Sequence, residues 1–528
     1  MTAFNHRDRH DSWRESRLDG WVDGYTADTV YLDQITTQHC PAWFSMIAVL
    51  NGQPPLDAAG KIVWLDIACG TGLAACTVAA CHPGFEVWGI DYNPAHVERA
   101  RRLARAAGLS NVTFVEADFA SVARDRSIGP AEVDVVVANG VYSWVSPANQ
   151  RHIVDTVRQR LRPGGLAHVM FETVGGWASM TPVAEALRLM VDADGRRGDL
   201  AFHDAAAAMG ELAANGAAYF PMGSKETNQM QGWADLDPRL AAHEYLGAHF
   251  APLDAVDVHE LFASAKCTWV GTLDPLGHHP YYSVPPGFAD VLAARQVLPS
   301  VEMLRDLILQ TAVRDDLFRR GRAAVTPFEH EAWLLGLEIR GLGRPLSTEP
   351  VDLHAMKINL DPVFHQPLLD ALDGGPVSAL SVLGIHPSWT LADATTAIGL
   401  LVAAGYAAPS LPGGAAPGAI DACRRLNREL GRERHLGWPH TAVAAPATGA
   451  MVSLDLVEVL ALDAIWDGCE PTTYELSSQV TQALAALGLT VRDGTGLVRE
   501  PERAAAIVGN RVSNLLARRG ALDLLGVT

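Results

Sequence analysis

The sequence predicts an α/β fold in which a doubly wound parallel sheet is followed by mainly helical domains. Three observations support this prediction. Short runs rich in Val and Ile alternate with helical patterns over residues 61–171, and such helices supply the long crossovers that parallel strands need. After Trp177 the sequence becomes Ala-rich and mainly helical. The chain of 528 residues is also long enough for about three or four domains.

Five short apolar runs are expected to form strands, because they are rich in β-branched residues and too short for helices. They are Ile62–Ile67, Glu86–Ile90, Val112–Glu116, Val133–Ala138 and Leu166–Phe171. Between the second and third runs, Asn93 and Pro94 supply a helix cap and a helix-starting proline, and Gly108 ends the helix. Ser146 and Pro147 open another helix in the same way.

The rest of the chain is predicted to be mainly helical. A helical run is expected over about residues 289–322, and a Gly-Gly-Pro stretch at residues 374–376 interrupts the chain. We predict a division into four domains. They cover residues 1–180, 181–290, 291–373 and 374–528.

Composition excludes several classes of protein. The chain carries 41 basic and 60 acidic side chains, a formal charge of −19, which disfavours nucleic acid or an anionic membrane as a partner. The basic run at residues 424–434 is interrupted by Glu429 and Glu433 and is interpreted as a solvated helix face. Seven cysteines form no CxxC pair, so we expect no metal site. Residues 1–17 lack the apolar core of a secretory signal, no apolar run is long enough to span a membrane, and we expect a cytoplasmic protein.

A glycine-rich turn follows the first predicted strand and leads into a helix. It runs from Asp66 through Ala68 and Gly70 to Gly72. Open sheets bind cofactors at such turns, and glycines let the backbone approach a ligand closely. The GxGxxG pattern of dinucleotide-binding proteins is absent, and an acidic residue is a poor neighbour for a pyrophosphate. An acidic residue suits a cofactor with positive charge, and S-adenosylmethionine carries an ammonium and a sulfonium.

Two further aspartates follow the next strands in the order that this cofactor requires. Asp91 ends the second strand beside Tyr92, where it could accept hydrogen bonds from both ribose hydroxyls. Asp118 follows the third strand and could accept one from the adenine amino group, with Phe119 covering the ring. Singly, each aspartate is more often a turn residue, but together they favour cofactor binding.

On these residues, the stretch 61–171 resembles class I S-adenosylmethionine-dependent methyltransferases. The resemblance implies a Rossmann-like sheet of seven strands, in-line transfer of the methyl group from sulfonium to a nucleophile, and S-adenosyl-L-homocysteine as a product. Catalysis in that family is mostly alignment of the two reactants and needs no metal.

The loop after the fourth strand is expected to face the transferred methyl group. This loop contains Asn139, then Tyr142 three residues later and Trp144 two residues after that. The amide oxygen of Asn139 can accept a hydrogen bond from an amine and hold it in line with the methyl group, and an aromatic face can stabilise the positive charge that passes to the amine. Asn139 is also expected to lie near the cofactor. Glu172 ends the fifth strand and could recognise a cationic acceptor or take its proton. Alternatively, the two aromatic residues pack the sheet edge and Glu172 is a solvated carboxylate.

Short blocks extend the resemblance over most of the chain. Residues 140–145, 176–177, 243–246 and 316–321 are similar to bacterial methyltransferases with a methyltransferase regulatory domain and a terminal winged-helix domain, a group that includes rickettsial protein-lysine methyltransferases. In that group an amino-terminal tyrosine, here Tyr25, lies close to the cofactor. The four domains would then be a methyltransferase domain, a regulatory domain that covers the substrate, a helical linking domain and a winged-helix-like domain.

The segment around residue 243 is expected to fold back over the active site. His243, Glu244 and Tyr245 would then contact the acceptor together with Trp144 and Trp177, or form a structural hydrogen-bond cluster instead. The zinc motif HExxH fails at its last position, so no metal follows from it.

Two departures from that group concern the acceptor and leave the cofactor site intact. Its members commonly carry His where this chain has Asn139, and Asn where it has Glu172. These departures do not support a transfer of the group's protein-lysine substrate to this chain. The acceptor that we expect is an amine on a protein, a peptide or a specialised metabolite. A small-molecule O- or C-methyltransferase is one alternative, and a cofactor-binding regulatory or protein-interaction protein without turnover is another. Family likeness also implies that the terminal domain mediates protein contacts, including a homodimer.

Overall fold

The computed structural model describes residues 22–528 except 28, 34–36, 58–59, 222–223, 234–235, 296–299, 354–355, 437, 439 and 494–495. The amino-terminal segment in which we expect no secretory signal lies outside the described residues. Within the described ranges, no helix is both long enough and apolar enough to cross a membrane.

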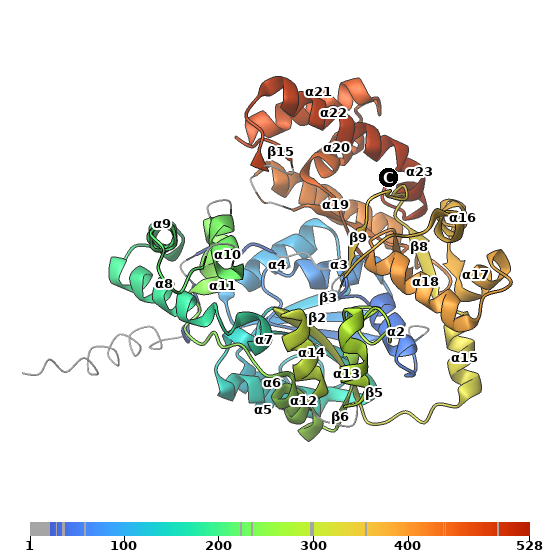
Figure 1. Cartoon of the computed structure of the whole chain (residues 1–528), viewed down its shortest axis with the longest axis horizontal. Coiled ribbons are helices and arrows are strands. Elements are labelled where there is room, and N and C mark those ends of the chain that lie inside the picture. The colour runs from blue at the N-terminus through green and yellow to red at the C-terminus, as the bar shows by residue number, and fades with distance from the viewer. Residues whose placement is uncertain are drawn as a thin grey trace, which may run out of the picture.

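A seven-stranded sheet forms the centre of the molecule (Figure 1). Its strands lie in the order β3-β2-β1-β4-β5-β7-β6, and β7 runs antiparallel to the rest. They are β1 (Val63–Ile67), β2 (Glu86–Asp91), β3 (Val112–Glu116), β4 (Val133–Ala138), β5 (Leu161–Glu172), β6 (Cys267–Thr272) and β7 (Val313–Arg320). The strand order reverses between β1 and β4, so a ligand crevice is expected at their carboxyl ends. The predicted fold class is confirmed.

The first five strands are those predicted from the sequence, with β5 beginning earlier, at Leu161. The predicted caps are also confirmed. Asn93 accepts a hydrogen bond from the backbone N–H of Ala95 at 2.9 Å and opens α4 (Pro94–Ala106). Ser146 accepts one from Asn149 at 3.3 Å and opens α6 (Pro147–Arg160).

The last two strands lie in segments for which the sequence predicts helical domains. The helical run expected over residues 289–322 is wrong in its last part, because α14 ends at Leu309 and β7 follows. A strand as charged as β7 can be buried only when its charges are paired. Arg314 lies 3.1 Å from Asp316 and 3.0 Å from Asp306, and all three side chains are buried. The sheet thus continues beyond residue 180, while the four-domain division stays a prediction.

Helices cover both faces of the sheet, as alternation along β1 requires. Trp64 points into the core on one face, and Val63, Leu65 and Ile67 point into the core on the other. The helices of the first face are α2 (Pro41–Leu50), α3 (Leu73–Cys81) and α4; those of the second are α5 (Phe119–Arg124), α6 and α12 (Ala255–Ser264).

A helical bundle is inserted between β5 and β6 and stands to one side of the sheet, in green in Figure 1. It is built from α7 (Val174–Trp177), α8 (Thr181–Asp194), α9 (Gly198–Ala214), α10 (Lys225–Trp233) and α11 (Pro238–Tyr245). Its core is separate from that of the sheet and includes Trp177, Phe202 and Tyr245. The short helices η2 (Pro286–Phe288), α13 (Ala289–Ala293) and α14 (Val301–Leu309) lie between β6 and β7.

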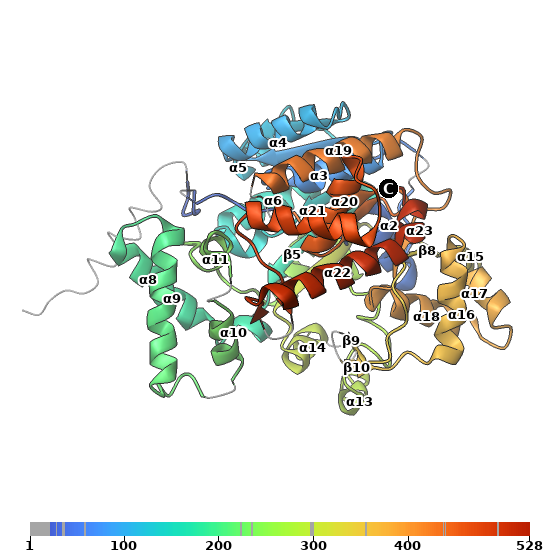
Figure 2. The same cartoon turned by 90° about the horizontal axis from the view of Figure 1, so that it is seen from above.

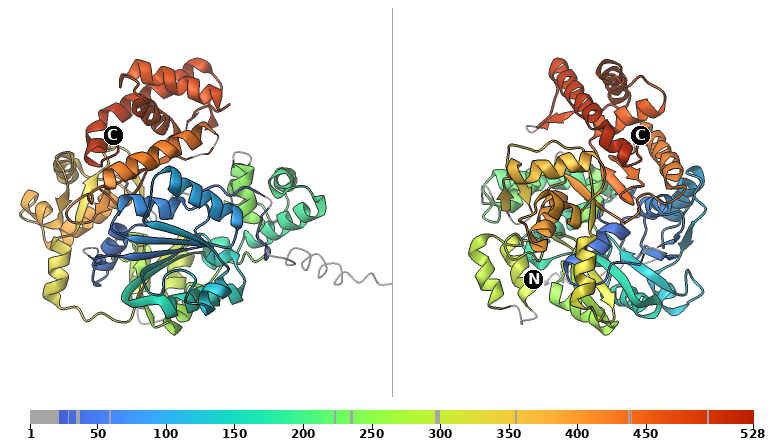
Figure 3. Two further views of the ribbon diagram at one scale, coloured as in Figure 1. Left: turned by 180° about the vertical axis from the view of Figure 1, so that it is seen from behind. Right: turned by 90° about the vertical axis from the view of Figure 1, so that its right-hand side faces the viewer.

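The carboxyl-terminal part begins with α15 (Pro327–Leu335) and packs on the first face of the sheet (Figures 2 and 3). Its first half is β8 (Glu338–Gly341), β9 (Val351–Leu353), β10 (Met356–Ile358), α16 (Pro362–Asp373), β11 (Val377–Ser378), α17 (Ala379–Ile385), α18 (Leu391–Ala403) and β12 (Ala407–Ser410). Its second half is α19 (Ala419–His435), β13 (Ala442–Ala445), β14 (Ala450–Ser453), α20 (Leu456–Trp466), α21 (Thr473–Ala486), β15 (Arg492–Asp493), β16 (Gly496–Leu497), α22 (Pro501–Ala517) and α23 (Arg519–Leu524). Its winged-helix character stays a prediction.

Helix α19 joins this part to the sheet. It packs on α3 and α4, and Sγ of Cys423 lies 3.6 Å from Sγ of Cys81. One continuous apolar core includes α2, α3 and residues 337–451. The carboxyl-terminal part is therefore packed against the sheet and not tethered beside it.

Candidate active site

The glycine-rich turn between β1 and α3 adopts the left-handed backbone that its sequence predicts. Ala68, Gly70 and Gly72 have φ values of 60°, 54° and 83°. A Cβ atom at Gly72 would lie 2.5 Å from Cβ of Ala100, so this glycine is required by helix packing. A Cβ atom at Gly70 would lie 3.2 Å from the ring of Tyr31. Gly70 is thus the glycine over which an amino-terminal side chain lies.

Two carboxylates line this turn, and both are buried. Oδ2 of Asp91 accepts a hydrogen bond from the backbone N–H of Gly70 at 2.9 Å, and its Oδ1 accepts one from Asn93 at 2.9 Å. Burial, with a contribution from Asp91, raises the pKa of Asp66 to about 7. A carboxylate has about four acceptor positions, so Asp91 can still bind ribose hydroxyls. Two buried acids beside an open turn fit a ligand that carries positive charge.

Asp118 lies at the start of α5 and is exposed. Its Oδ1 accepts a hydrogen bond from the backbone N–H of Ser121 at 2.8 Å, and its Oδ2 accepts one from the Ser121 hydroxyl at 2.9 Å. The carboxylate therefore caps a helix, which agrees with the alternative that Asp118 is a turn residue. Its hydrogen bond to adenine stays a prediction. Phe119 is half-buried against the second face of the sheet.

Aromatic rings from three segments gather beside the turn. The Tyr25 ring lies 6.0 Å from Tyr92 and 5.4 Å from His243, between ring centroids. Tyr31 lies 5.3 Å from His243 and 5.7 Å from His96. Nε2 of His243 lies 3.1 Å from the backbone oxygen of Thr29. Residues 29–33 therefore lie beside the cofactor turn. Tyr25 and Tyr92, both predicted to bind the cofactor, lie next to His243, which was predicted to contact the acceptor.

Two acceptor atoms stand at the ends of the neighbouring strands β4 and β5. Asn139 follows β4 directly, and Glu172 is the last residue of β5, with 1% of its surface exposed. Oδ1 of Asn139 and Oε2 of Glu172 are buried, and neither has a hydrogen-bond partner among the described residues. Glu172 is not the solvated carboxylate of the alternative. Buried acceptors without donors are unfavourable, so this position is suited to a ligand with N–H groups.

The environment of Glu172 disfavours its charge. Burial, and then the nearby Glu244, raise the pKa of Glu172 well above its usual range. Burial raises the pKa of Glu244 to about 7. The backbone N–H of Glu172 donates to Oγ of Ser143 at 2.9 Å, which fixes the strand end. A cationic or proton-releasing ligand would relieve the repulsion between the two carboxylates.

Tyr142 points away from these strand ends. Its ring is 1% exposed and lies 6.1 Å from Phe262 of α12, in the core of the second face. This placement favours the alternative in which Tyr142 packs the edge of the sheet.

Three further aromatic residues lie where the inserted bundle meets the sheet. Trp144 contacts Phe250, with 5.6 Å between ring centroids, and Trp177 lies 4.8 Å from the same ring. Tyr245 packs 5.8 Å from Phe202 inside the bundle and is 5% exposed. Nε1 of Trp144 and Nε1 of Trp177 have no partner among the described residues. The two tryptophans thus remain candidates for acceptor binding, while Tyr245 serves the bundle core.

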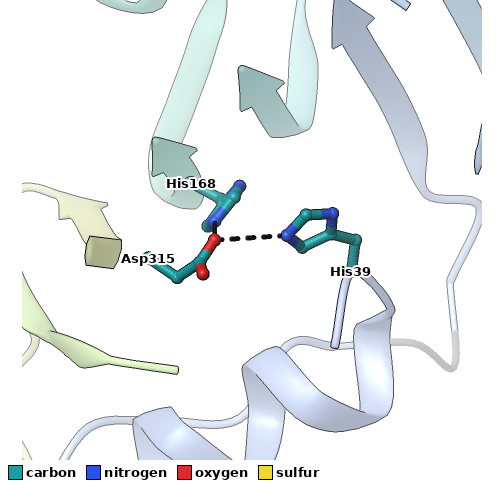
Figure 4. A group of neighbouring side chains, drawn as sticks. All are labelled: His39, His168 and Asp315. Atoms are coloured by element: carbon teal, nitrogen blue, oxygen red, sulfur yellow. Dashed lines mark hydrogen bonds and ion pairs between the residues drawn. The ribbon is translucent and has the colours of Figure 1, made fainter. Parts of the chain in front are cut away.

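His39, His168 and Asp315 meet where α2 begins (Figure 4). Nε2 of His168 and Nε2 of His39 lie 2.9 and 3.4 Å from Oδ1 of Asp315. Metal ligation through Nε2 would leave a buried Nδ1–H on each ring, and neither Nδ1 has a partner among the described residues. Metal-bound imidazoles nearly always donate that second N–H. The cluster therefore fits histidines hydrogen-bonded to a carboxylate, and burial followed by the nearby His39 lowers the pKa of His168.

A cavity of about 630 Å³ lies between α19, α20 and α21, in the carboxyl-terminal part. It is lined by residues such as Leu460, Cys469 and Gln482 and by none of the predicted site residues. We do not include it in the candidate site.

Residues 65–165 match the family model described as a methyltransferase domain. They form an S-adenosylmethionine-dependent methyltransferase domain. The match covers the glycine-rich turn and the strands β2 to β4, where the cofactor-binding residues are predicted. The predictions that the protein is an enzyme and that its cofactor is S-adenosylmethionine are confirmed for the methyltransferase domain.

Similar proteins extend the likeness beyond the methyltransferase domain. An uncharacterized protein of Synechocystis sp. is 24% identical over 366 residues, which cover 68% of this chain and 70% of that protein. A carboxy-S-adenosyl-L-methionine synthase of Klebsiella pneumoniae is 27% identical over 165 residues, 31% of this chain and 64% of that enzyme. The solved structure of PKMT2 from Rickettsia typhi in complex with AdoHcy covers 94% of this chain and 99% of that one, with a TM-score of 0.65 at 18% identity. The fold is therefore shared over nearly the whole chain.

Sequence reasoning missed three residues at the edge of the methyltransferase domain. Tyr31 packs on Gly70, Asp33 accepts a hydrogen bond from the Thr71 hydroxyl, and Arg99 lies behind Asp33. Tyr31 and Asp33 follow the Tyr25 segment, which was the only available signal for them. Arg99 occupies an ordinary helical position in the sequence, and only its burial shows its importance.

Proposed function

We propose that the methyltransferase domain transfers a methyl group to an amine bound between Asn139 and Glu172. The observation that carries this proposal is the pair of buried, unpartnered acceptors at the ends of β4 and β5. An amine N–H is the donor that both atoms lack. A hydroxyl acceptor could donate to only one of them, so the O-methyltransferase alternative is less well supported.

When bound, S-adenosylmethionine supplies an electrophilic methyl group. On our proposal, Asp66 and Asp91 face its positive and ribose groups, and Gly70 allows close backbone approach. Tyr25 and Tyr92 would cover it from the amino-terminal side, and Asp118 and Phe119 would contact its adenine.

Three residues of this chain would act on the acceptor. The amine must arrive neutral, because an ammonium has no lone pair to form the new bond. Asn139 would accept one N–H and hold the lone pair in line with the methyl group. In its ionised form, Glu172 would accept another N–H and then the proton that the methylated nitrogen releases, with Glu244 keeping its affinity for protons high.

The acceptor is proposed to sit on a protein, a peptide or a specialised metabolite. The net charge of −19 supports a neutral or cationic partner and disfavours nucleic acid. The absence of a membrane-spanning helix in the described ranges is compatible with the expected cytoplasmic location. A homodimer through the terminal domain is proposed on family likeness alone.

The proposal is tested by incubating the protein with S-adenosylmethionine labelled on the methyl group and with lysate fractions separated by size. Label that becomes acid- and base-stable on a macromolecule supports an amine on a protein, and label in small molecules supports a metabolite. Asp91→Ala serves as the matched control without cofactor binding. Tight cofactor binding without labelling of any fraction would favour the non-enzymatic alternative.

A further inference from the structure

A buried ion-pair network links α19 to the methyltransferase domain. The Arg99 guanidinium, on α4, donates to Oε1 and Oε2 of Glu433 at 3.0 and 2.9 Å. It also lies over the Trp438 ring, 3.4 Å from the centroid. Nε2 of His440 lies 2.9 Å from Oε2 of Glu433. The interpretation of the basic run on α19 as a solvated face is thus wrong for Glu433 and Arg434, which are 8% and 1% exposed.

The same guanidinium faces the cofactor turn. Its NH2 lies 3.8 Å from Oδ2 of Asp33. The other oxygen of Asp33 accepts a hydrogen bond from the hydroxyl of Thr71, which stands between the two glycines of the turn. Arg99 is therefore shared between a carboxylate of α19 and a carboxylate of the segment that lies beside the turn.

Asp33 depends on that positive charge. Its side chain is nearly inaccessible to solvent, and burial raises its pKa. The Thr71 hydroxyl, His440 and Arg99 lower that pKa, and the nearby Glu433 raises it. A buried carboxylate that loses its counter-charge is strongly unfavourable. Without Arg99, the segment would lower its energy by moving Asp33 to water and away from Thr71. Tyr31, two residues earlier, would then leave Gly70.

We propose that α19 sets cofactor affinity by clamping Arg99 so that Asp33 holds the segment 22–33 on the cofactor turn. Arg99, Glu433 and Asp33 are positioning residues in this scheme, since they act through Thr71 and Tyr31 and not on the reacting atoms. The proposal rests on the assignment of the cofactor to this turn. It adds a role for the carboxyl-terminal part, 334 residues away from Arg99 in sequence.

A second contact between the same two helices provides a matched control. Nε of Arg425, also on α19, donates to the backbone oxygen of Ala107 at the end of α4 at 2.9 Å. This bond ties α19 to α4, and within the described part of the chain Arg425 forms no hydrogen bond or ion pair with Asp33 or Thr71. Arg425→Gln therefore loosens the helix pair without removing the charge that Asp33 requires.

The test measures S-adenosyl-L-homocysteine affinity by calorimetry in the full chain, with the thermal midpoint of each variant. We expect Glu433→Gln and Arg99→Gln to weaken binding by about tenfold or more, which corresponds to ~1.4 kcal/mol. We expect Arg425→Gln to change the affinity less than twofold at a comparable loss of thermal stability. Equal effects of Glu433→Gln and Arg425→Gln on affinity would overturn the proposal.

A double-mutant cycle separates positioning from general damage. Asn at position 33 can still accept the Thr71 hydrogen bond but needs no counter-charge, so in Asp33→Asn protein the Arg99→Gln change should alter affinity less than twofold. A tenfold effect that persists in this background contradicts the proposal. Asp91→Ala tests the cofactor assignment independently, because its failure to weaken binding would displace the site whatever Glu433 does.

Discussion

At the scale of single residues, the acceptor site depends on Asn139. Its carbonyl oxygen is buried at the end of β4 without a described partner, so its role should appear only when an acceptor is bound. We expect Asn139→Ala to reduce kcat by about 100-fold, within the range for a positioned polar group. Calorimetric affinity for S-adenosyl-L-homocysteine should stay within twofold of wild type. An unchanged turnover number would remove Asn139 from catalysis.

Glu172 should make stability depend on pH. Its pKa is raised by burial and by Glu244, so the folded protein holds this proton more tightly than the unfolded chain does. Its contribution to stability is complete below the unfolded pKa, about 4.3, and is lost as pH rises through the folded pKa. Glu172→Gln should therefore raise the thermal midpoint more at pH 8 than at pH 5.

The measurement compares midpoints of variant and wild type at both pH values. Glu116, on β3, has an exposed side chain, so Glu116→Gln serves as the control for losing one carboxylate outside the candidate site. A Glu172→Gln effect that is equal at both pH values would show that Glu172 does not carry the raised pKa.

At the scale of elements, the two glycines of the turn have different duties. A Cβ at Gly72 would meet Ala100 at 2.5 Å and the Phe114 ring at 2.9 Å, whereas one at Gly70 would meet only the Tyr31 ring at 3.2 Å. Gly72→Ala should destabilise the protein by roughly 2–4 kcal/mol through overpacking and strain. Gly70→Ala should destabilise it less and weaken cofactor binding more. Denaturant unfolding and calorimetry distinguish the two, and a reversed order would contradict these roles.

The strands that sequence reasoning found were those with local signals. β3 and β4 are short, rich in Val and bounded by turn residues, so pattern alone set their limits. β7 carries Arg314, Asp315 and Asp316, and its burial depends on partners such as Asp306 and His168 that no local pattern identifies. Sequence patterns therefore failed to predict β7, a strand whose burial requires paired charges.

The candidate site divides in the same way. Asp66 lies near the end of β1, Asp91 ends β2 and Asn139 follows β4, so topology alone brought them to one edge of the sheet. The ring of Tyr142 could not be placed, because whether it faces the ligand or Phe262 depends on packing against α12. Glu433 contacts Arg99 beside the candidate site although the two residues are 334 positions apart in the sequence, and no local pattern predicts that contact.

At the scale of the whole molecule, the methyltransferase domain shares one core with α16 to α19 of the carboxyl-terminal part, while α20 to α23 have a core of their own. Eight of the nine residues of α3 are buried, because the sheet covers one side of this helix and α19 covers the other. A helix that is apolar all round requires such complete cover. We expect the sheet and helices α16 to α19 to unfold together.

This expectation is measured by differential scanning calorimetry with a tryptophan fluorescence signal followed in parallel. One coincident transition should include the sheet, and the inserted bundle, with its separate core, can melt earlier. Separate transitions for the sheet and the carboxyl-terminal part would show that their shared core contributes little to cooperativity.

The position of α19 also has a consequence for synthesis on the ribosome. The surface of α3 that Cys81 presents is covered by Cys423, which lies 342 residues later. At about 5–20 residues per second, this interval lasts roughly 17–70 s. The last strand, β7, ends at Arg320, so in the final part of this interval an assembled sheet exposes an apolar helix face to the cell. Newly made chains should therefore require a chaperone that holds this face until the last third of the protein has been translated.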